Sequence, residues 1–176
     1  MLASLAKCYP DERNLVVSAR SIDLLLFMVA RGADGKTLKE LAHLFRGFQP
    51  EDIDKIIKSI MRGHNLMLEK LTMLPGVQLL SANAVWVNKS LAPSISAEYQ
   101  AAVAKEFDAT FVCDKKFSDE SVLSDINNWA AAKTNNLISK VIDRRELFPT
   151  DVAVLLNALY FKGTWARKFD KNDTTD

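Results

Sequence analysis

The feature that most constrains the fold of this chain is an almost continuously apolar run near its C-terminal end, DVAVLLNALYFKGTW (residues 151–165). A strand that is apolar at consecutive positions is normally covered on both faces, so the run predicts a strand that is buried on both sides of its sheet. Asn157 interrupts it. Because a buried carboxamide without partners costs about 1–3 kcal/mol, we expect the side chain of Asn157 to be hydrogen-bonded.

The sequence leaves the partners of Asn157 open. In one interpretation the amide is a single satisfied structural group, and in the other it belongs to a polar cluster beneath the sheet. Ser18 and Ser21 are the candidates for that cluster, because they stand where the short segment NLVVS (14–18), interpreted as a strand, meets the first long helix. Their hydroxyls could reach a strand that packs on the N-terminus of this helix.

Apolar residues spaced three and four apart predict helices along much of the chain. The first helix starts near Ser21, ends at Gly32, and has a predicted buried stripe made of Ile22, Leu25, Leu26 and Val29. The second begins at a capping box formed by Thr37 and Glu40. Further helices, each with one apolar face, are predicted over residues 53–71, 94–108 and 118–135.

Two other segments predict strands. VQLLSANAVWVN (77–88) and ATFVC (109–113) are rich in branched and aromatic residues. Helices come first along the chain, and the long strands are separated by helices. No repeat or low-complexity linker divides the sequence, so we expect an α+β fold with residues 1–176 in one domain.

Charge and ligand spacing exclude several classes of function. Lys and Arg number 23 against 22 Asp and Glu, so no basic excess indicates a nucleic-acid partner. No apolar run approaches the length of a membrane span. Cys8, Cys113, His43 and His64 show no metal-ligand spacing, so we expect no metal or cofactor. His64 is interpreted as a helix-edge residue, and the cysteines as free thiols, with a disulfide between them as the alternative.

The segment ARGADGKT only partly matches a phosphate-binding loop. Gly35, Lys36 and Thr37 fit the end of that pattern, but Ala30 occupies the place of its first glycine. The segment also follows a predicted helix, whereas a phosphate loop follows a strand, so a turn between helices is the better interpretation. No G-x-S-x-G elbow is present, and neither histidine lies near a nucleophile motif. We therefore expect that the protein is not an enzyme.

Five separated segments resemble the serpin family in their order and spacing. They are NLVVSARSI, RGADGKTLKEL with a following Phe, ANAVWVNKSL, INNWAAAKTNNLI and LLNALYFKGTWARKFD. The resemblance covers essentially all 176 residues and implies a serpin-like α+β fold, with N-terminal helices plus strands of the large central β-sheet. A complete serpin is far longer, so we expect this chain to be the N-terminal half of an incomplete single domain, truncated before the reactive-centre loop.

The resemblance also implies a mechanism. Serpins keep their central sheet metastable; a protease cleaves the reactive-centre loop, the loop inserts as a new strand, and the protease stays trapped as an acyl-enzyme. The implied partners are a serine or cysteine protease and a complementary C-terminal fragment. The parent protein would then be a suicide-substrate inhibitor, and this chain could not inhibit by itself. The alternatives are a non-inhibitory carrier on a serpin scaffold and an inert truncated product.

Site residues follow from the same resemblance. Asn157, Ser18 and Ser21 would lie in the shutter, where the sheet parts, and Trp165 at the breach, where the loop first enters. The helix containing INNW (126–129) resembles the one that crosses the front of the sheet.

Three further features qualify the resemblance. The helix over 53–71 corresponds to the one that binds glycosaminoglycan in some members, but acidic residues offset its basic ones, so heparin binding has little support. The family usually has proline and an uncharged residue where this chain has Ala19 and Arg20. Proline would fix φ at the helix start, so its absence could alter the rigidity of the shutter.

The family resemblance predicts an extracellular protein, although the N-terminus is too short and too soon charged to be a signal peptide. An intracellular location is the alternative. Two N-x-[ST] sequons, at Asn88 and Asn172, become glycosylation sites only if the protein is secreted.

Overall fold

The computed structural model describes residues 17–45 and 48–167 of the chain. This part has the predicted α+β composition, with the apolar run forming its last strand. The elements are α2 (Ala19–Arg31), α3 (Gly35–Leu44), η1 (Pro50–Asp52), α4 (Ile53–Thr72), β1 (Val77–Val87), η2 (Lys89–Ser94), α5 (Ala97–Phe107), β2 (Ala109–Val112), α6 (Glu120–Lys133) and β3 (Ala153–Gly163).

The three strands form one mixed sheet in the order β2–β1–β3. β1 and β3 are antiparallel along their whole length, from Val77 opposite Gly163 to Val87 opposite Ala153. β2 runs parallel to β1 and pairs only with its second half, starting where Asn83 lies opposite Ala109. Within the described residues β1 is therefore the central strand and the apolar run forms an edge strand, of which only Ala158 is buried, so the prediction that the run is covered on both faces is wrong for most of its length.

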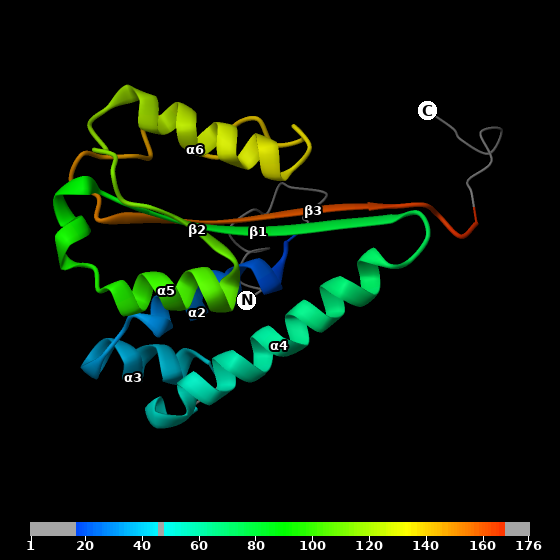
Figure 1. Cartoon of the computed structure of the whole chain (residues 1–176), viewed down its shortest axis with the longest axis horizontal. Coiled ribbons are helices and arrows are strands. Elements are labelled where there is room, and N and C mark those ends of the chain that lie inside the picture. The colour runs from blue at the N-terminus through cyan, green and yellow to red at the C-terminus, as the bar shows by residue number, and fades with distance from the viewer. Residues whose placement is uncertain (1–16, 46–47, 168–176) are drawn as a thin grey trace, which may run out of the picture.

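Two hydrophobic cores lie on opposite faces of the sheet. Because successive side chains of a strand point to opposite faces, Val85 and Val87 pack with α2, α4 and α5, whereas Ala84 and Trp86 pack with α6. Figure 1 shows this layering, with α6 on one side of the sheet and the other helices on the opposite side. The middle and end of β1 are thus enclosed from both directions.

The start of α3 differs from the prediction. Asp34 caps this helix, because its carboxylate accepts the Gly35 N–H at 2.7 Å. Gly35 has a φ of +55°, which glycine adopts without strain, and the helix begins two residues before Thr37. The predicted capping box of Thr37 and Glu40 is wrong. The prediction of a turn between two helices is confirmed.

The buried face of α2 also differs from the prediction. Leu24, Phe27 and Met28 are almost inaccessible, whereas Val29 is 39% exposed. Of the predicted stripe, Leu25 and Leu26 are only partly buried against the core. Residues 22–30 are apolar except at Asp23, so periodicity could not single out one face of the helix. Packing against neighbouring elements decided which side became buried.

Most of the strand predicted at residues 14–18 lies outside the described residues, and Val17 and Ser18 are not in a strand. Among the helices in the described ranges, none combines the length and the hydropathy that crossing a membrane requires.

Candidate functional site

Two asparagines meet across the sheet at its centre. The β1–β3 register places Asn83 directly opposite Asn157. Asn157 donates from Nδ2 to the Asn83 Oδ1 at 2.8 Å, and Asn83 donates from its own Nδ2 to the Phe107 carbonyl at 2.7 Å. The three groups form a polar seam running from β3 through β1 to the end of α5. The prediction that the Asn157 amide is hydrogen-bonded is therefore confirmed.

One atom of this polar seam keeps an unused hydrogen-bonding capacity. The Oδ1 of Asn157 is buried and accepts no hydrogen bond from any described residue. Leaving a buried acceptor unsatisfied costs about 1–3 kcal/mol, which makes this oxygen a point where an added donor would be stabilising. Asn157 lies on the edge strand, so such a donor can approach from the open side of β3.

The interpretation that Ser18 and Ser21 bond to Asn157 is not met in this structure. The Ser18 Oγ accepts the Ser21 N–H at 3.2 Å and the Ser21 hydroxyl at 2.8 Å, so the two serines cap α2 and satisfy one another. Within the described residues no hydrogen bond joins either serine to Asn157. Asn83 is the partner because strand pairing brings it directly opposite, whereas a serine must reach from a neighbouring helix.

Sequence reasoning missed Asn83. Its signal was present, since the predicted strand over 77–88 carries an asparagine flanked by Ala82 and Ala84, a pattern like the one around Asn157. What the sequence lacked was the register that sets the two carboxamides opposite one another. Asn83 is 4% exposed, so water cannot reach its side chain and protein groups must supply its hydrogen bonds.

The first turn of α2 is joined to α4 through Arg20 and His64. Arg20 donates from Nε to the His64 Nδ1 at 3.3 Å, and from its terminal nitrogen to the Ile60 carbonyl at 3.5 Å. His64 is 4% exposed, so the interpretation of this histidine as a helix-edge residue is wrong. Burial, together with the guanidinium of Arg20, lowers the pKa of His64. The imidazole therefore accepts the bond as a neutral ring.

Asn88 fastens the opposite end of the β1–β3 pair. Its Nδ2 donates to the carbonyls of Pro149 and Asp151, at 2.9 and 3.1 Å, and the residue is 5% exposed. A glycan replaces one of the two hydrogens on this nitrogen, so its addition would end the burial and leave a donor for only one of the two hydrogen bonds. The folded chain thus offers no accessible acceptor at Asn88. The second sequon, at Asn172, lies outside the described residues.

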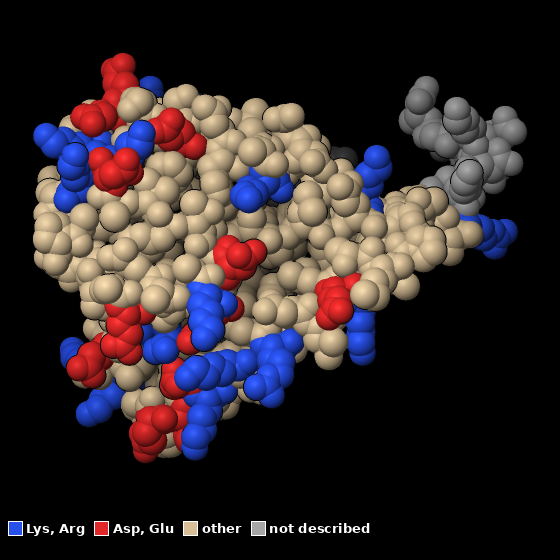
Figure 2. Space-filling model, in the orientation of Figure 1, with Lys and Arg blue, Asp and Glu red and all other residues tan. Residues whose placement is uncertain are grey.

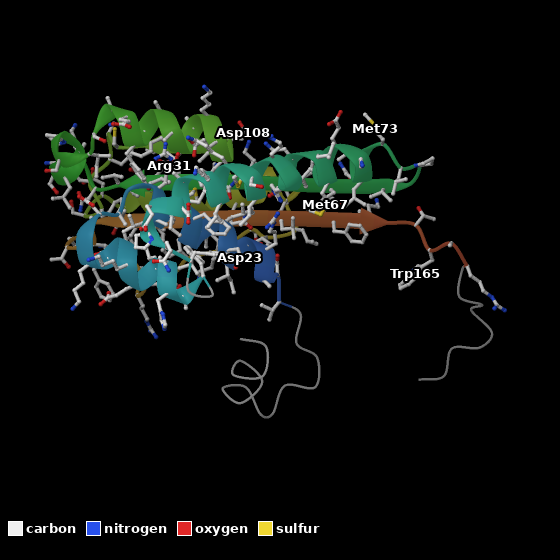
Figure 3. All side chains as sticks on the ribbon, turned by 90° about the horizontal axis from the view of Figure 1, so that it is seen from below. Asp23, Arg31, Met67, Met73, Asp108 and Trp165 are labelled. Carbon is white, nitrogen blue, oxygen red and sulfur yellow. The ribbon has the colours of Figure 1, made fainter. Side chains whose placement is uncertain are left out.

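The other end of β3 is much less covered. Phe161 is 65% exposed, and Trp165, two residues beyond the strand, is 68% exposed. Figure 3 shows Trp165 past the tip of β3, away from the helices. In Figure 2 few charged groups lie over this end, whereas both signs gather over the helices. The predicted breach residue therefore stands at an open end of the sheet, near a second exposed aromatic side chain.

The helix α6 is tied to the loop that follows it. The Asn127 Oδ1 accepts the Val141 and Ile142 N–H groups at 2.7 and 3.1 Å, and its Nδ2 donates to the Ile142 carbonyl at 3.0 Å. The predicted apolar face of this helix is confirmed, with Val122 and Ile126 fully buried against the sheet. α6 and residues 141–142 therefore form one bonded unit over that face.

Ionic contacts on the opposite face are local. Arg31 lies 3.0 Å from Glu106 and 3.3 Å from Asp54, which joins α2, α4 and α5, and its hydrogen bond to Glu106 raises the pKa of Arg31. Asp54 also accepts from Lys58 at 2.6 Å, and chiefly this bond lowers the pKa of Asp54. Part of the positive charge of α4 is thus already paired with carboxylates.

Among the described residues, no group of three or more His, Cys, Asp or Glu side chains is placed to hold a metal ion. Cys113 is a free, half-buried thiol, whereas Cys8 lies outside the described residues. The chemistry that the β1–β3 pair and its polar seam can perform is strand pairing and the exchange of hydrogen bonds.

Comparisons with known proteins identify the family. The family profile described as "Serpin (serine protease inhibitor)" matches residues 1–176. A serine protease inhibitor of Cyanea capillata is 36% identical over 94% of this chain. The chain spans 42% of that relative's length, 38% of the length of the protein named "Putative serpin-Z8" of Oryza sativa subsp. japonica and 44% of that of antichymotrypsin-2 of Bombyx mori.

Solved structures agree with this assignment. Native protease nexin-1 with heparin is similar with a TM-score of 0.80 and 28% identity, and thyroxine-binding globulin complexed with thyroxine with a TM-score of 0.78 and 26% identity. Each alignment covers 99% of this chain and 46% of the other protein. The profile match over the whole sequence and the shared fold together show that this chain belongs to the serpin family.

Proposed function

We propose that the serpin to which these residues belong inhibits serine or cysteine endopeptidases by conformational trapping. The observation that carries this proposal is the state of β3, a long strand paired with β1 on one edge and open along the other within the described residues. An open edge presents unpaired N–H and C=O groups that an added strand can satisfy. In the proposed mechanism, the cleaved reactive loop supplies that strand.

The polar seam offers a hydrogen bond that would stabilise the inserted strand. The buried Oδ1 of Asn157 accepts no hydrogen bond, so a donor delivered on the neighbouring strand would satisfy it. Ser18 and Ser21 hold the start of α2 in place beside the sheet, and Trp165 marks the open end where a loop would enter. In this proposal Asn157 and Asn83 act as a latch whose bonding changes when the sheet opens.

The inserting segment and the protease are supplied from outside the described residues. We propose that the strand comes from further sequence of the same polypeptide or from a complementary C-terminal fragment. An extracellular location, with a glycan at Asn172, belongs to the same proposal. Because the chain spans less than half of the length of these relatives, trapping is proposed for the whole protein.

A non-inhibitory carrier is the second candidate, and one comparison supports it almost as strongly as the inhibitor. The neighbour that is complexed with thyroxine has nearly the same structural similarity as protease nexin-1, with TM-scores of 0.78 and 0.80. The scaffold therefore does not distinguish a ligand carrier from a protease inhibitor.

The test is to incubate the full-length gene product with trypsin-like, chymotrypsin-like and papain-like proteases and to examine the mixtures by denaturing gel electrophoresis. Trapping predicts a covalent complex that survives denaturation, whereas the 176-residue chain alone gives none. The variant Asn157→Leu should form less complex than the matched control Asn128→Leu, which changes an exposed residue of α6. Cleavage without any stable complex across the panel would favour the carrier.

A further inference from the structure

The edge of the sheet that lies opposite β3 carries a second unfilled strand position. β1 pairs with β3 over its whole length, but β2 pairs with it only from Asn83 onward. Residues 77–82 of β1 thus have a strand neighbour on one side alone within the described part of the chain. In a strand, alternate residues direct their N–H and C=O groups to each side, so backbone groups here face an open edge.

The chain does not fill this position because β2 begins late. Asp108 ends α5 in the left-handed conformation, with φ +49° and ψ +39°, and the chain then turns directly into β2. Figure 3 labels Asp108 where α5 ends, close to α4. Figure 1 shows β1 continuing past β2, with α6 on one side of it and α4 on the other.

A cavity of about 320 Å³ occupies this strand position. On the α4 side it is lined by Leu68 of α4 and by Leu79 and Ser81, which lie on the same face of β1. On the α6 side it is lined by Leu80, Ala82 and Ala132. The cavity therefore straddles the edge of the sheet, and an extended peptide, whose successive side chains point to opposite faces, would place them in both halves.

We propose that the edge of β1 over Leu79–Ala82 is a docking site for a short extended peptide segment of a partner protein, which pairs with β1 in line with β2. This site lies on the edge of β1 that faces away from β3, whereas trapping is proposed at the open edge of β3, so the site does not rest on the proposed function. Backbone pairing would provide much of the affinity, and the two halves of the cavity would select side chains.

Polar groups around the cavity specify the chemistry of the segment. The hydroxyl oxygen of Ser81 is buried and has no partner among the described residues, so it calls for a polar or backbone group in the α4 half. Asp108 and Lys133 both line the cavity, and neither forms an ion pair within the described ranges. A segment with small or apolar residues inside the cavity and one basic and one acidic residue at its rim complements these groups.

The experiment uses the 176-residue chain and a positional-scanning library of short peptides blocked at both ends. Backbone amide shifts in NMR locate the binding, and fluorescence anisotropy of the best sequence gives its Kd. We expect shifts confined to the β1 edge, the start of β2 and the end of α6. N-methylation of the peptide nitrogens that pair with β1 should weaken binding roughly tenfold or more, since each methyl removes a donor and clashes with the strand.

Two protein variants with matched controls complete the test. Ala132→Trp fills the α6 half of the cavity and should abolish binding, whereas Ala104→Trp, at an exposed site on α5, should not. Lys133→Glu should shift the charge preference of the bound sequences, and Lys36→Glu on α3 should leave it unchanged. If Ala132→Trp has no cooperative urea transition, the variant is not folded, and the N-methylated peptides then test the proposal on the wild-type chain. Absence of any binding sequence, shifts along β3 instead, or indifference to N-methylation would overturn the proposal.

Discussion

The two halves of the β1–β3 pair share one antiparallel register but differ in what covers them. In the half from Asn83 to Val87, β1 is buried at every position, with β2 alongside and helices on both faces. In the half from Val77 to Ala82 none of its residues is buried, and Phe161 on the opposite strand is 65% exposed. The pairing is continuous, so it is the covering layers that make one half a core and the other a surface.

The helix α4 repeats this contrast along its own length. Ile53, Ile57 and Met61 are buried, and His64 is the last residue of the helix that is. Beyond it the helix continues to Thr72, yet Leu66 and Met67 are close to half exposed. The Arg20–His64 bond thus marks the boundary between the enclosed and the exposed parts of the molecule.

The largest effect that separates the two halves should come from truncating an aromatic residue in each. Trp86→Ala removes a 5%-exposed side chain from the core beneath α6 and should cost about 3–5 kcal/mol in the free energy of unfolding. Urea denaturation followed by circular dichroism measures the loss. If Trp86→Ala lowers the free energy of unfolding by less than Phe161→Ala does, enclosure is not what distinguishes the two halves.

The polar seam should give the next largest effect. Asn83→Ala removes the 2.8 Å acceptor of the Asn157 amide, which keeps only its 3.4 Å hydrogen bond to the Ala82 carbonyl, and it removes the donor to the Phe107 carbonyl, so it should cost about 1–3 kcal/mol. A double-mutant cycle with Asn157→Ala, measured by urea denaturation, should show coupling, because the two side chains bond directly. Asn128→Ala on the surface of α6 is the control. Additive losses would mean that the 2.8 Å bond contributes nothing of its own.

Acid should weaken the enclosed half first. The pKa of His64 lies below its ordinary value in the folded chain, so the unfolded chain takes up the proton first as the pH falls. The associated stability is complete above about pH 6.5 and is lost as the pH falls from there toward the folded pKa, by up to about 1.4 kcal/mol per pH unit.

The pH effect is isolated by a difference measurement. Urea midpoints of the wild type and of His64→Gln are compared across that pH range, because carboxylates titrate at still lower pH in both proteins. We expect the difference between the two urea midpoints to change as His64 titrates. Parallel curves would show that the Arg20–His64 contact does not sense protons.

The smallest effect should come from the exposed half. Phe161→Ala should change the free energy of unfolding by no more than about 0.5 kcal/mol, because the ring is mostly in water already. Urea denaturation beside Trp86→Ala provides the matched comparison. A loss of several kcal/mol would show that Phe161 is covered in solution, by a strand or by a second molecule.

Particular residues show how far sequence reasoning reached in the fold. The helix over 118–135 is predicted by its apolar spacing, the strand over 77–88 by its branched and aromatic residues, and the strand over 151–165 by its continuous apolar run. The buried face of α2 was predicted wrongly because almost every residue between Ile22 and Ala30 is apolar. The cap of α3 was misassigned because Thr37 and Asp34 both suit a helix start, and the backbone turn at Gly35 favoured the earlier one.

The candidate site divides in the same way. The sequence by itself determined that Asn157 must be hydrogen-bonded, since an apolar run leaves a carboxamide no water. Only the tertiary structure decided that its partner is Asn83 and that Ser18 and Ser21 bond to each other. Periodicity reports which residues of one segment share a face, whereas register and helix placement are set by contacts between segments far apart in the chain.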